Sequence, residues 1–139
     1  MQIVREAVRL SILETLAEGM FGDLVKAVVD VENGIMAVGG EMHADEEALL
    51  LGHGSPQVSL WGINLYPGQF GTARFIEFDS VINIRPRQGN RTRSVDDAAQ
   101  PVGHHGQQTR DAGQKEDRRD GELDGMGHQL YKWPSPSGH

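Results

Sequence analysis

Residues 24–40 read LVKAVVDVENGIMAVGG, two runs rich in β-branched residues on either side of Asn33-Gly34. Asn-Gly between two apolar runs is the strongest short signal for a β-hairpin, because a type I′ turn needs positive φ at both central positions. The sequence therefore predicts an antiparallel hairpin here. Gly39-Gly40 predicts a bend or bulge at the end of its second strand.

A short helix is expected before this hairpin. The motif Ser11–Glu14 has the pattern of a capping box, so the helix should begin at Ile12. An apolar stripe follows at helical spacing, and Gly19 and Gly22 mark its end after about ten residues.

Three segments after the hairpin complete the expected fold. Residues 41–51 (EMHADEEALLL) fit either a helix capped by Asp45 or a strand, and the flanking strands favour a strand. Residues 60–66 (LWGINLY) predict a strand, and residues 74–85 (RFIEFDSVINIR) predict the longest strand. The expected fold is α+β, a small antiparallel sheet of four or five strands, built as a meander of hairpins, with the N-terminal helix packed on one face.

Composition limits the class of protein. The chain has 139 residues, a formal net charge of -7 and no cysteine, which excludes disulfides and cysteinyl zinc sites. The negative charge argues against general binding to nucleic acid or to an anionic membrane surface. Because no apolar run approaches a membrane span and no secretion signal is present, a cytoplasmic location is expected.

The chain divides after about residue 97. Residues 98–139 contain few large apolar side chains, without helical or strand periodicity, so they are predicted to be disordered. The single small α+β domain, residues 1–97, would bury only about 60 to 65% of its unfolded surface. A homo-oligomer is therefore expected.

Two carboxylates form the first candidate site. In the predicted strand 74–85, period 2 puts Ile76, Phe78, Ser80, Ile82 and Ile84 on a core face, and Phe75, Glu77, Asp79, Val81, Asn83 and Arg85 on the other. Glu77 and Asp79 are candidate ligands for a divalent metal such as magnesium. Alternatively, they are ordinary polar residues of a solvated face.

The second candidate site is the arginine loop, which we define as residues 85–93 (RPRQGNRTR). A turn that presents several guanidinium groups can bind phosphate or carboxylate, and the candidate anion-binding residues are Arg85, Arg87, Asn90, Arg91 and Arg93. The alternative is salt links to the protein's own acids, within the chain or between subunits. The acids that could form such links are Glu77, Asp79, Asp96, Asp97 and the run 45–47.

A third candidate site combines His43, Asp45 and His53. Two histidines and a carboxylate can hold zinc or iron. The alternative is an exposed acidic turn and a loop histidine.

Several blocks together resemble a known family. They are HADEEALLL (43–51), LWGINLYP (60–67), FIEFDS (75–80) and INIRP with QGNRTR (82–86 and 88–93). In this order and spacing they resemble a small uncharacterised prokaryotic family, a domain of unknown function, over residues 2–97. The resemblance implies one compact domain and a bacterial source, and it brings no activity or catalytic residue.

The C-terminal part departs from that family, whose members continue after an acidic pair, here Asp96-Asp97, into a short amphipathic helix. The codons for residues 107–111, read one base later, can encode a sequence similar to the end of that family helix. We therefore hypothesise a frameshift near Ala98.

These observations favour a non-catalytic binding module without a cofactor, in which the arginine loop and the polar strand face recognise a protein or a phosphate-bearing partner. The alternative is a divalent-metal-dependent hydrolase or nuclease that uses Glu77 and Asp79 with the arginines.

Overall fold

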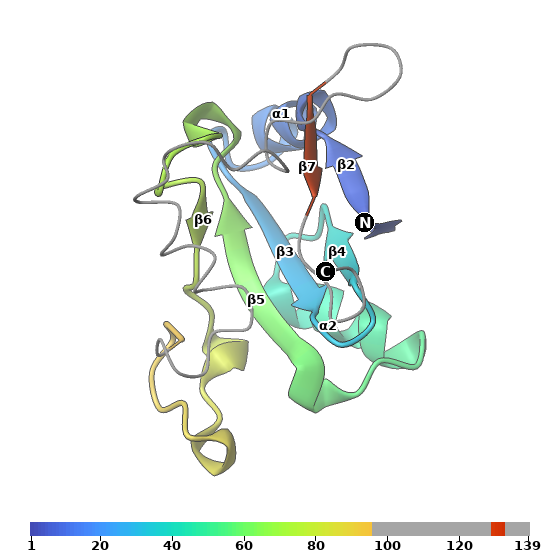
Figure 1. Cartoon of the computed structure of the whole chain (residues 1–139), viewed down its shortest axis with the longest axis vertical. Coiled ribbons are helices and arrows are strands. Elements are labelled where there is room, and N and C mark those ends of the chain that lie inside the picture. The colour runs from blue at the N-terminus through green and yellow to red at the C-terminus, as the bar shows by residue number, and fades with distance from the viewer. Residues whose placement is uncertain (96–128, 133–139) are drawn as a thin grey trace.

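The computed structural model describes residues 1–95 and 129–132 (Figure 1). A five-stranded antiparallel sheet has the strand order β1-β4-β3-β5-β6. Its strands are β1 (Gln2–Arg5), β3 (Val25–Asp30), β4 (Ile35–Val38), β5 (Leu60–Leu65) and β6 (Ile76–Glu77). A separate two-stranded sheet pairs β2 (Ala7–Arg9) with β7 (Leu130–Lys132). The predicted α+β class is confirmed.

The predicted hairpin is β3 and β4, which pair with Asp30 opposite Ile35. The prediction of a type I′ turn is wrong. Residues 31–34 form a longer loop, in which Gly34 has a φ of 71° and Asn33 has no positive φ. The buried Asp30 carboxylate causes this, since it accepts hydrogen bonds from the backbone N–H groups of Glu32 and Asn33 and from the Asn33 amide. The bend after β4 is confirmed by Gly39, whose φ is 90°.

Helix α1 (Leu10–Gly19) covers one face of the sheet with the buried residues Leu13 and Ala17. The helix was predicted, but its start was not. It begins at Leu10 with Arg9 as N-cap and without a side-chain cap, so the Ser11 capping box is wrong. The reason is that β2 leads directly into the helix, which buries Leu10 and leaves Ser11 exposed in the first turn.

Helix α2 (His43–Gly52) covers the opposite face and lies behind the sheet in Figure 1. The preference for a strand over residues 41–51 is therefore wrong, and the N-cap is Met42 rather than Asp45. The helix turns His43, Glu46 and Leu50 towards the sheet, at helical spacing. Two of these three residues are polar, which hid the helical period from an apolar pattern.

The prediction of a long strand over residues 74–85 is also wrong. Only Ile76–Glu77 pair with β5, and 3-10 turns follow at Val81–Asn83 (η3) and Pro86–Gln88 (η4). The predicted faces fail as a result. Phe75 and Asn83, expected on the polar face, are buried, whereas Ile84, expected in the core, is 40% exposed.

Both faces of the sheet carry buried apolar side chains, so the expected solvated face is covered over much of its area by α2. The core on the α1 side includes Val25, Ala27, Val29, Met36, Val38, Trp61, Ile63 and Leu65. The core on the α2 side consists of Val28, Ile35, Ala37, Leu50 and Leu60.

Strand β7 lies within the segment for which disorder was predicted. Leu130–Lys132 pair with β2, and Tyr131 is 1% exposed in the α1-side core. The rest of that segment, 98–128 and 133–139, lies outside the described residues. In the described part of the chain, no helix has the length and apolar character needed to cross a membrane.

Candidate functional site: the arginine loop and the polar end of the sheet

The arginine loop is closed by its own backbone. The Arg85 N–H donates to the Asn90 carbonyl at 2.6 Å, and the Asn90 N–H donates to the Arg85 carbonyl at 3.1 Å. Between them, Pro86–Gln88 form η4, and Gly89 takes the left-handed conformation at a φ of 84° that ends this turn. The loop backbone therefore has a defined shape.

The Asn90 side chain fixes the rest of the loop from inside. This residue is fully buried, and its amide nitrogen lies 2.7, 3.0 and 2.8 Å from the carbonyl oxygens of Asn83, Thr92 and Ser94. Asn90 was a candidate anion-binding residue. The structure gives its amide to the protein's own carbonyl groups.

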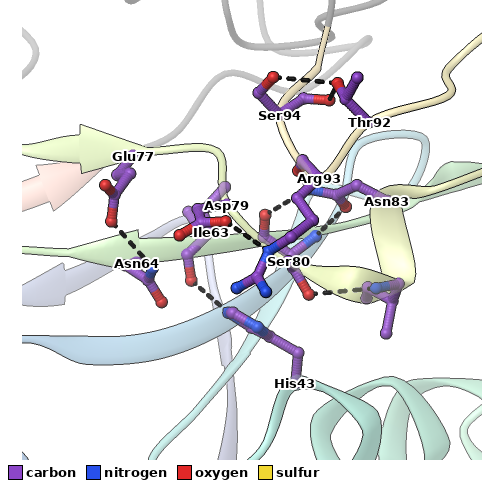
Figure 2. Close-up of polar contacts among 12 residues, drawn as sticks. His43, Ile63, Asn64, Glu77, Asp79, Ser80, Asn83, Thr92, Arg93 and Ser94 are labelled. Atoms are coloured by element: carbon purple, nitrogen blue, oxygen red, sulfur yellow. Dashed lines mark hydrogen bonds and ion pairs between the residues drawn. The ribbon is translucent and has the colours of Figure 1, made fainter.

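Asn83 joins the loop to the sheet (Figure 2). Its side-chain oxygen accepts from the Gly62 N–H at 2.8 Å, and its nitrogen donates to the Gly62 carbonyl at 2.9 Å. The same nitrogen also donates to the Arg93 carbonyl at 3.1 Å. The Asn83 amide thus takes the place of a strand residue beside β5, beyond the two residues of β6.

Arg85 is likewise turned towards the protein. Its guanidinium donates to the carbonyls of Gln57, at 2.5 Å, and Leu60, and it lies 4.1 Å from the centre of the Trp61 ring. Burial lowers the pKa of this guanidinium. Arg85 therefore ties the loop to the start of β5.

Arg93 forms an ion pair with Asp79, in which Nε lies 2.7 Å from a carboxylate oxygen. Both side chains are substantially exposed, at 57% and 43%, so the pair contributes little to stability. This contact is one of the internal salt links considered as the alternative to anion binding. Asp96 and Asp97 lie outside the described residues.

Arg87 and Arg91 differ from the other two arginines. Both are exposed, and neither makes a hydrogen bond or an ion pair within residues 1–95 and 129–132. Of the four arginines, these two are the ones without a partner among the described residues.

The two candidate metal ligands bond to protein groups. Glu77 accepts from the Asn64 amide at 3.0 Å and from the Tyr66 hydroxyl at 2.8 Å, while Asp79 accepts from Arg93. Burial, followed by the contact with Glu77, raises the pKa of Tyr66 to about 12. The described residues contain no group of three or more acidic, histidine or cysteine side chains arranged to hold a metal. The magnesium site at Glu77 and Asp79 stays a prediction.

The histidine set does not converge. His43 is buried under the sheet and its Nε2 donates to the Ile63 carbonyl at 2.8 Å, as Figure 2 shows, whereas Asp45 is exposed on the same helix. His53 lies beside Arg5, at 3.1 Å from its guanidinium. Burial lowers the pKa of His43, which therefore stays neutral at pH 7.

Sequence reasoning missed one close contact at this end of the sheet. A β-carbon built on Gly62 would lie 2.7 Å from Cβ and Oγ of Ser80 and 3.2 Å from the His43 ring. A glycine inside a strand is a signal of such close approach, and Gly62 lies at the centre of the predicted strand 60–66.

These features define a class: a small α+β domain with a helix on each face of an antiparallel sheet and a preformed arginine loop beside one edge strand. The chain belongs to the family described as "Protein of unknown function (DUF5674)", whose sequence model matches residues 2–101. The predicted membership of an uncharacterised domain family is confirmed. Neither the curated proteins nor the solved structures contain a significant match.

Proposed function

We infer that this domain is a non-catalytic binding module whose arginine loop recognises an anionic group on a protein or a phosphate-bearing partner. One observation supports this most directly. The backbone around Arg87 and Arg91 is held by the Arg85–Asn90 pair and by the buried Asn90 amide, while both guanidinium groups point to solvent. Arginines on a preformed loop lose less conformational entropy when they bind carboxylate or phosphate.

The different contacts of the four arginines support the same proposal. Arg85 stacks on Trp61 and bonds to two carbonyls, and Arg93 pairs with Asp79. Within residues 1–95 and 129–132, no acid pairs with Arg87 or Arg91.

The proposal is tested by an amide-resolved NMR titration of the full chain with pyrophosphate and then with a hexaglutamate peptide. Saturable shifts are expected in residues 86–92, and Arg91→Glu should weaken binding at least tenfold without lowering the melting temperature. Arg74→Glu makes the same charge change at an exposed arginine outside the loop and should bind like the natural chain. Equal weakening by both variants would reduce the effect to net charge and contradict recognition by the loop.

The same titration begins with magnesium, which tests the alternative of a metal-dependent hydrolase or nuclease. Saturable shifts centred on Glu77 and Asp79 would support that alternative.

The proposal of a binding module also includes a cytoplasmic location and a bacterial source.

A further inference from the structure

A second surface lies at the end of the molecule opposite the arginine loop, where β7 pairs with β2 (Figure 1). The antiparallel register sets Val8 opposite Tyr131, and the Leu10 N–H donates to the Gln129 carbonyl at 2.9 Å. The segment 129–132 is therefore bound along β2 as an added strand.

Its tyrosine enters an aromatic socket. The Tyr131 ring meets Phe75 edge to face, with 4.9 Å between ring centres, and Phe75 meets Phe70 in the same way at 5.0 Å. Tyr131 is 1% exposed and belongs to the same core as Val8. An edge-to-face aromatic pair stabilises beyond the area it buries, so this side chain anchors the strand.

The family model covers the surface formed by β2 and the aromatic socket, but it does not cover β7, which lies on that surface. Strand β2, Phe70 and Phe75 lie inside the family match, residues 2–101, whereas β7 lies beyond its end. The domain that the family model covers thus has an edge strand beside an apolar socket but not the strand that fills it here. An open strand edge next to an apolar socket is a site for strand addition.

We propose that β2 and the Phe70–Phe75 socket form a docking groove for an extended protein segment with a tyrosine opposite Val8, and that residues 129–132 occupy this groove in cis. Main-chain bonds along β2 supply affinity for any extended segment, while the socket supplies selectivity for the aromatic ring. A segment on the same chain acts at an effective concentration of up to about 1 mM, so it outcompetes a free segment at micromolar concentration. The proposal is independent of the arginine loop.

The test uses a fluorescent peptide with the sequence of residues 128–134 and the full chain carrying Tyr131→Ala. This variant empties the socket, so it should bind the peptide at least tenfold more tightly than the natural chain, measured by anisotropy. A peptide in which alanine replaces the tyrosine keeps the main-chain bonds but loses the socket contact, so it should bind the variant at least tenfold more weakly than the tyrosine peptide. Tyr66→Ala, which changes the other tyrosine of the chain, should behave like the natural chain.

Equal affinity for the natural chain and Tyr131→Ala, or equal binding of the two peptides, would overturn the proposal. So would absence of binding by a Tyr131→Ala chain that still unfolds cooperatively. If that variant does not fold, a protease site placed between residues 96 and 128 of the natural chain replaces it. After cleavage, the C-terminal fragment should co-elute with the domain and be displaced by the tyrosine peptide only. A fragment that separates at micromolar concentration, or that both peptides displace equally, contradicts a tyrosine-selective groove.

Discussion

Gly62 lies inside β5 where the side chains of Ser80 and His43 leave no room for a β-carbon. We predict that Gly62→Ala lowers the free energy of unfolding by about 1–3 kcal/mol, because a 2.7 Å approach to Ser80 must be relieved by moving η3 away from the sheet. Urea unfolding measures the change. Gly52→Ala, at an exposed position with open space around it, is the control and should change stability by less than about 0.5 kcal/mol.

If Gly62→Ala is as stable as Gly52→Ala, the close approach of η3 to β5 is not a feature of the protein in solution.

Glu46 is a fully buried carboxyl group between α2 and the bend after β4. One of its oxygens accepts from the Gly40 N–H at 2.8 Å, and the other is buried without a hydrogen-bond partner among the described residues. Burial, only partly opposed by the Gly40 bond, raises the pKa of Glu46 to about 9. The folded chain therefore keeps this group protonated at neutral pH, while the unfolded chain ionises it near pH 4.5.

This difference in pKa predicts a pH dependence with a definite sign. Between pH 4.5 and about 9 the folded state binds the extra proton, so the free energy of unfolding falls as pH rises and levels off above about 9. Glu46→Gln should abolish this fall, so that near pH 9 it gains about 1–3 kcal/mol relative to the natural chain. Urea unfolding from pH 6.5 to 9.5 measures it, above the range where protonation of His43 adds loss of stability at acidic pH.

Asp45→Asn is the matched control, since Asp45 is exposed in the same turn of α2. It should keep the slope of the natural chain. A natural chain whose stability is flat over this range would show that Glu46 is hydrated and ionised in solution.

Asn83 shows how one side chain stands in for a strand. Strand β6 ends at Glu77, yet β5 continues to Gly62, where the Asn83 amide meets both the N–H and the carbonyl. A primary amide offers the same donor and acceptor as a peptide group. The hydrogen-bonding groups of Gly62 at this edge of β5 are thereby satisfied without a further residue of β6 beside them.

We predict that Asn83→Ala lowers the free energy of unfolding by about 2–4 kcal/mol, because it leaves the buried Gly62 N–H and carbonyl without partners. Hydrogen exchange of the Gly62 amide should accelerate, while amides of the β3–β4 hairpin stay slow in a variant that is still folded. Asn83→Asp keeps the acceptor but loses the donor to Gly62 and Arg93, so it should also destabilise. An unchanged Gly62 exchange rate in both variants would contradict the substitution of a side chain for the ladder.

The same contact explains which elements the sequence can predict. The β3–β4 hairpin follows from residues adjacent in the chain, and strand β5 from its apolar run. Segment 74–85 has an alternating pattern but only two residues in the ladder with β5, because beyond Glu77 the side-chain amide of Asn83, not its backbone, bonds to Gly62. The periodicity of a sequence indicates which side chains can be buried. It does not indicate whether a backbone group or a side chain makes the hydrogen bonds to the neighbouring strand.

The arginine loop shows a similar limit for the candidate site. Its position, its turn and its charge can be predicted from RPRQGNRTR, and the structure places the turn at Pro86–Gln88. The separate roles of Arg85 and Arg91 were not, because Arg85 is fixed by Trp61 and Leu60, more than 20 positions earlier. Four arginines in nine positions look equivalent in the sequence, whereas the fold gives Arg85 and Arg93 partners within the chain.

For the whole molecule, the boundary predicted near residue 97 falls close to the end of the family match at residue 101. Residues 130–132 nevertheless pair with β2, so the segment beyond the boundary contributes Tyr131 to the core. The frameshift near Ala98 stays a hypothesis, and resequencing the gene tests it. A single reading frame without an alternative amphipathic helix would remove it.

The predicted homo-oligomer is testable by mass action. A domain of this size has a small core, and large apolar side chains such as Phe21, Val58 and Val81 are 42%, 60% and 64% exposed. If subunits associate through such side chains, the melting temperature should rise by several degrees over an about 100-fold increase in protein concentration, since association stabilises the folded state by about 2.7 kcal/mol over that range. Light scattering at the same concentrations measures the mass directly. A constant melting temperature together with the monomer mass of 15.2 kDa would contradict the prediction, and the helices on both faces of the sheet would then account for the stability of a single chain.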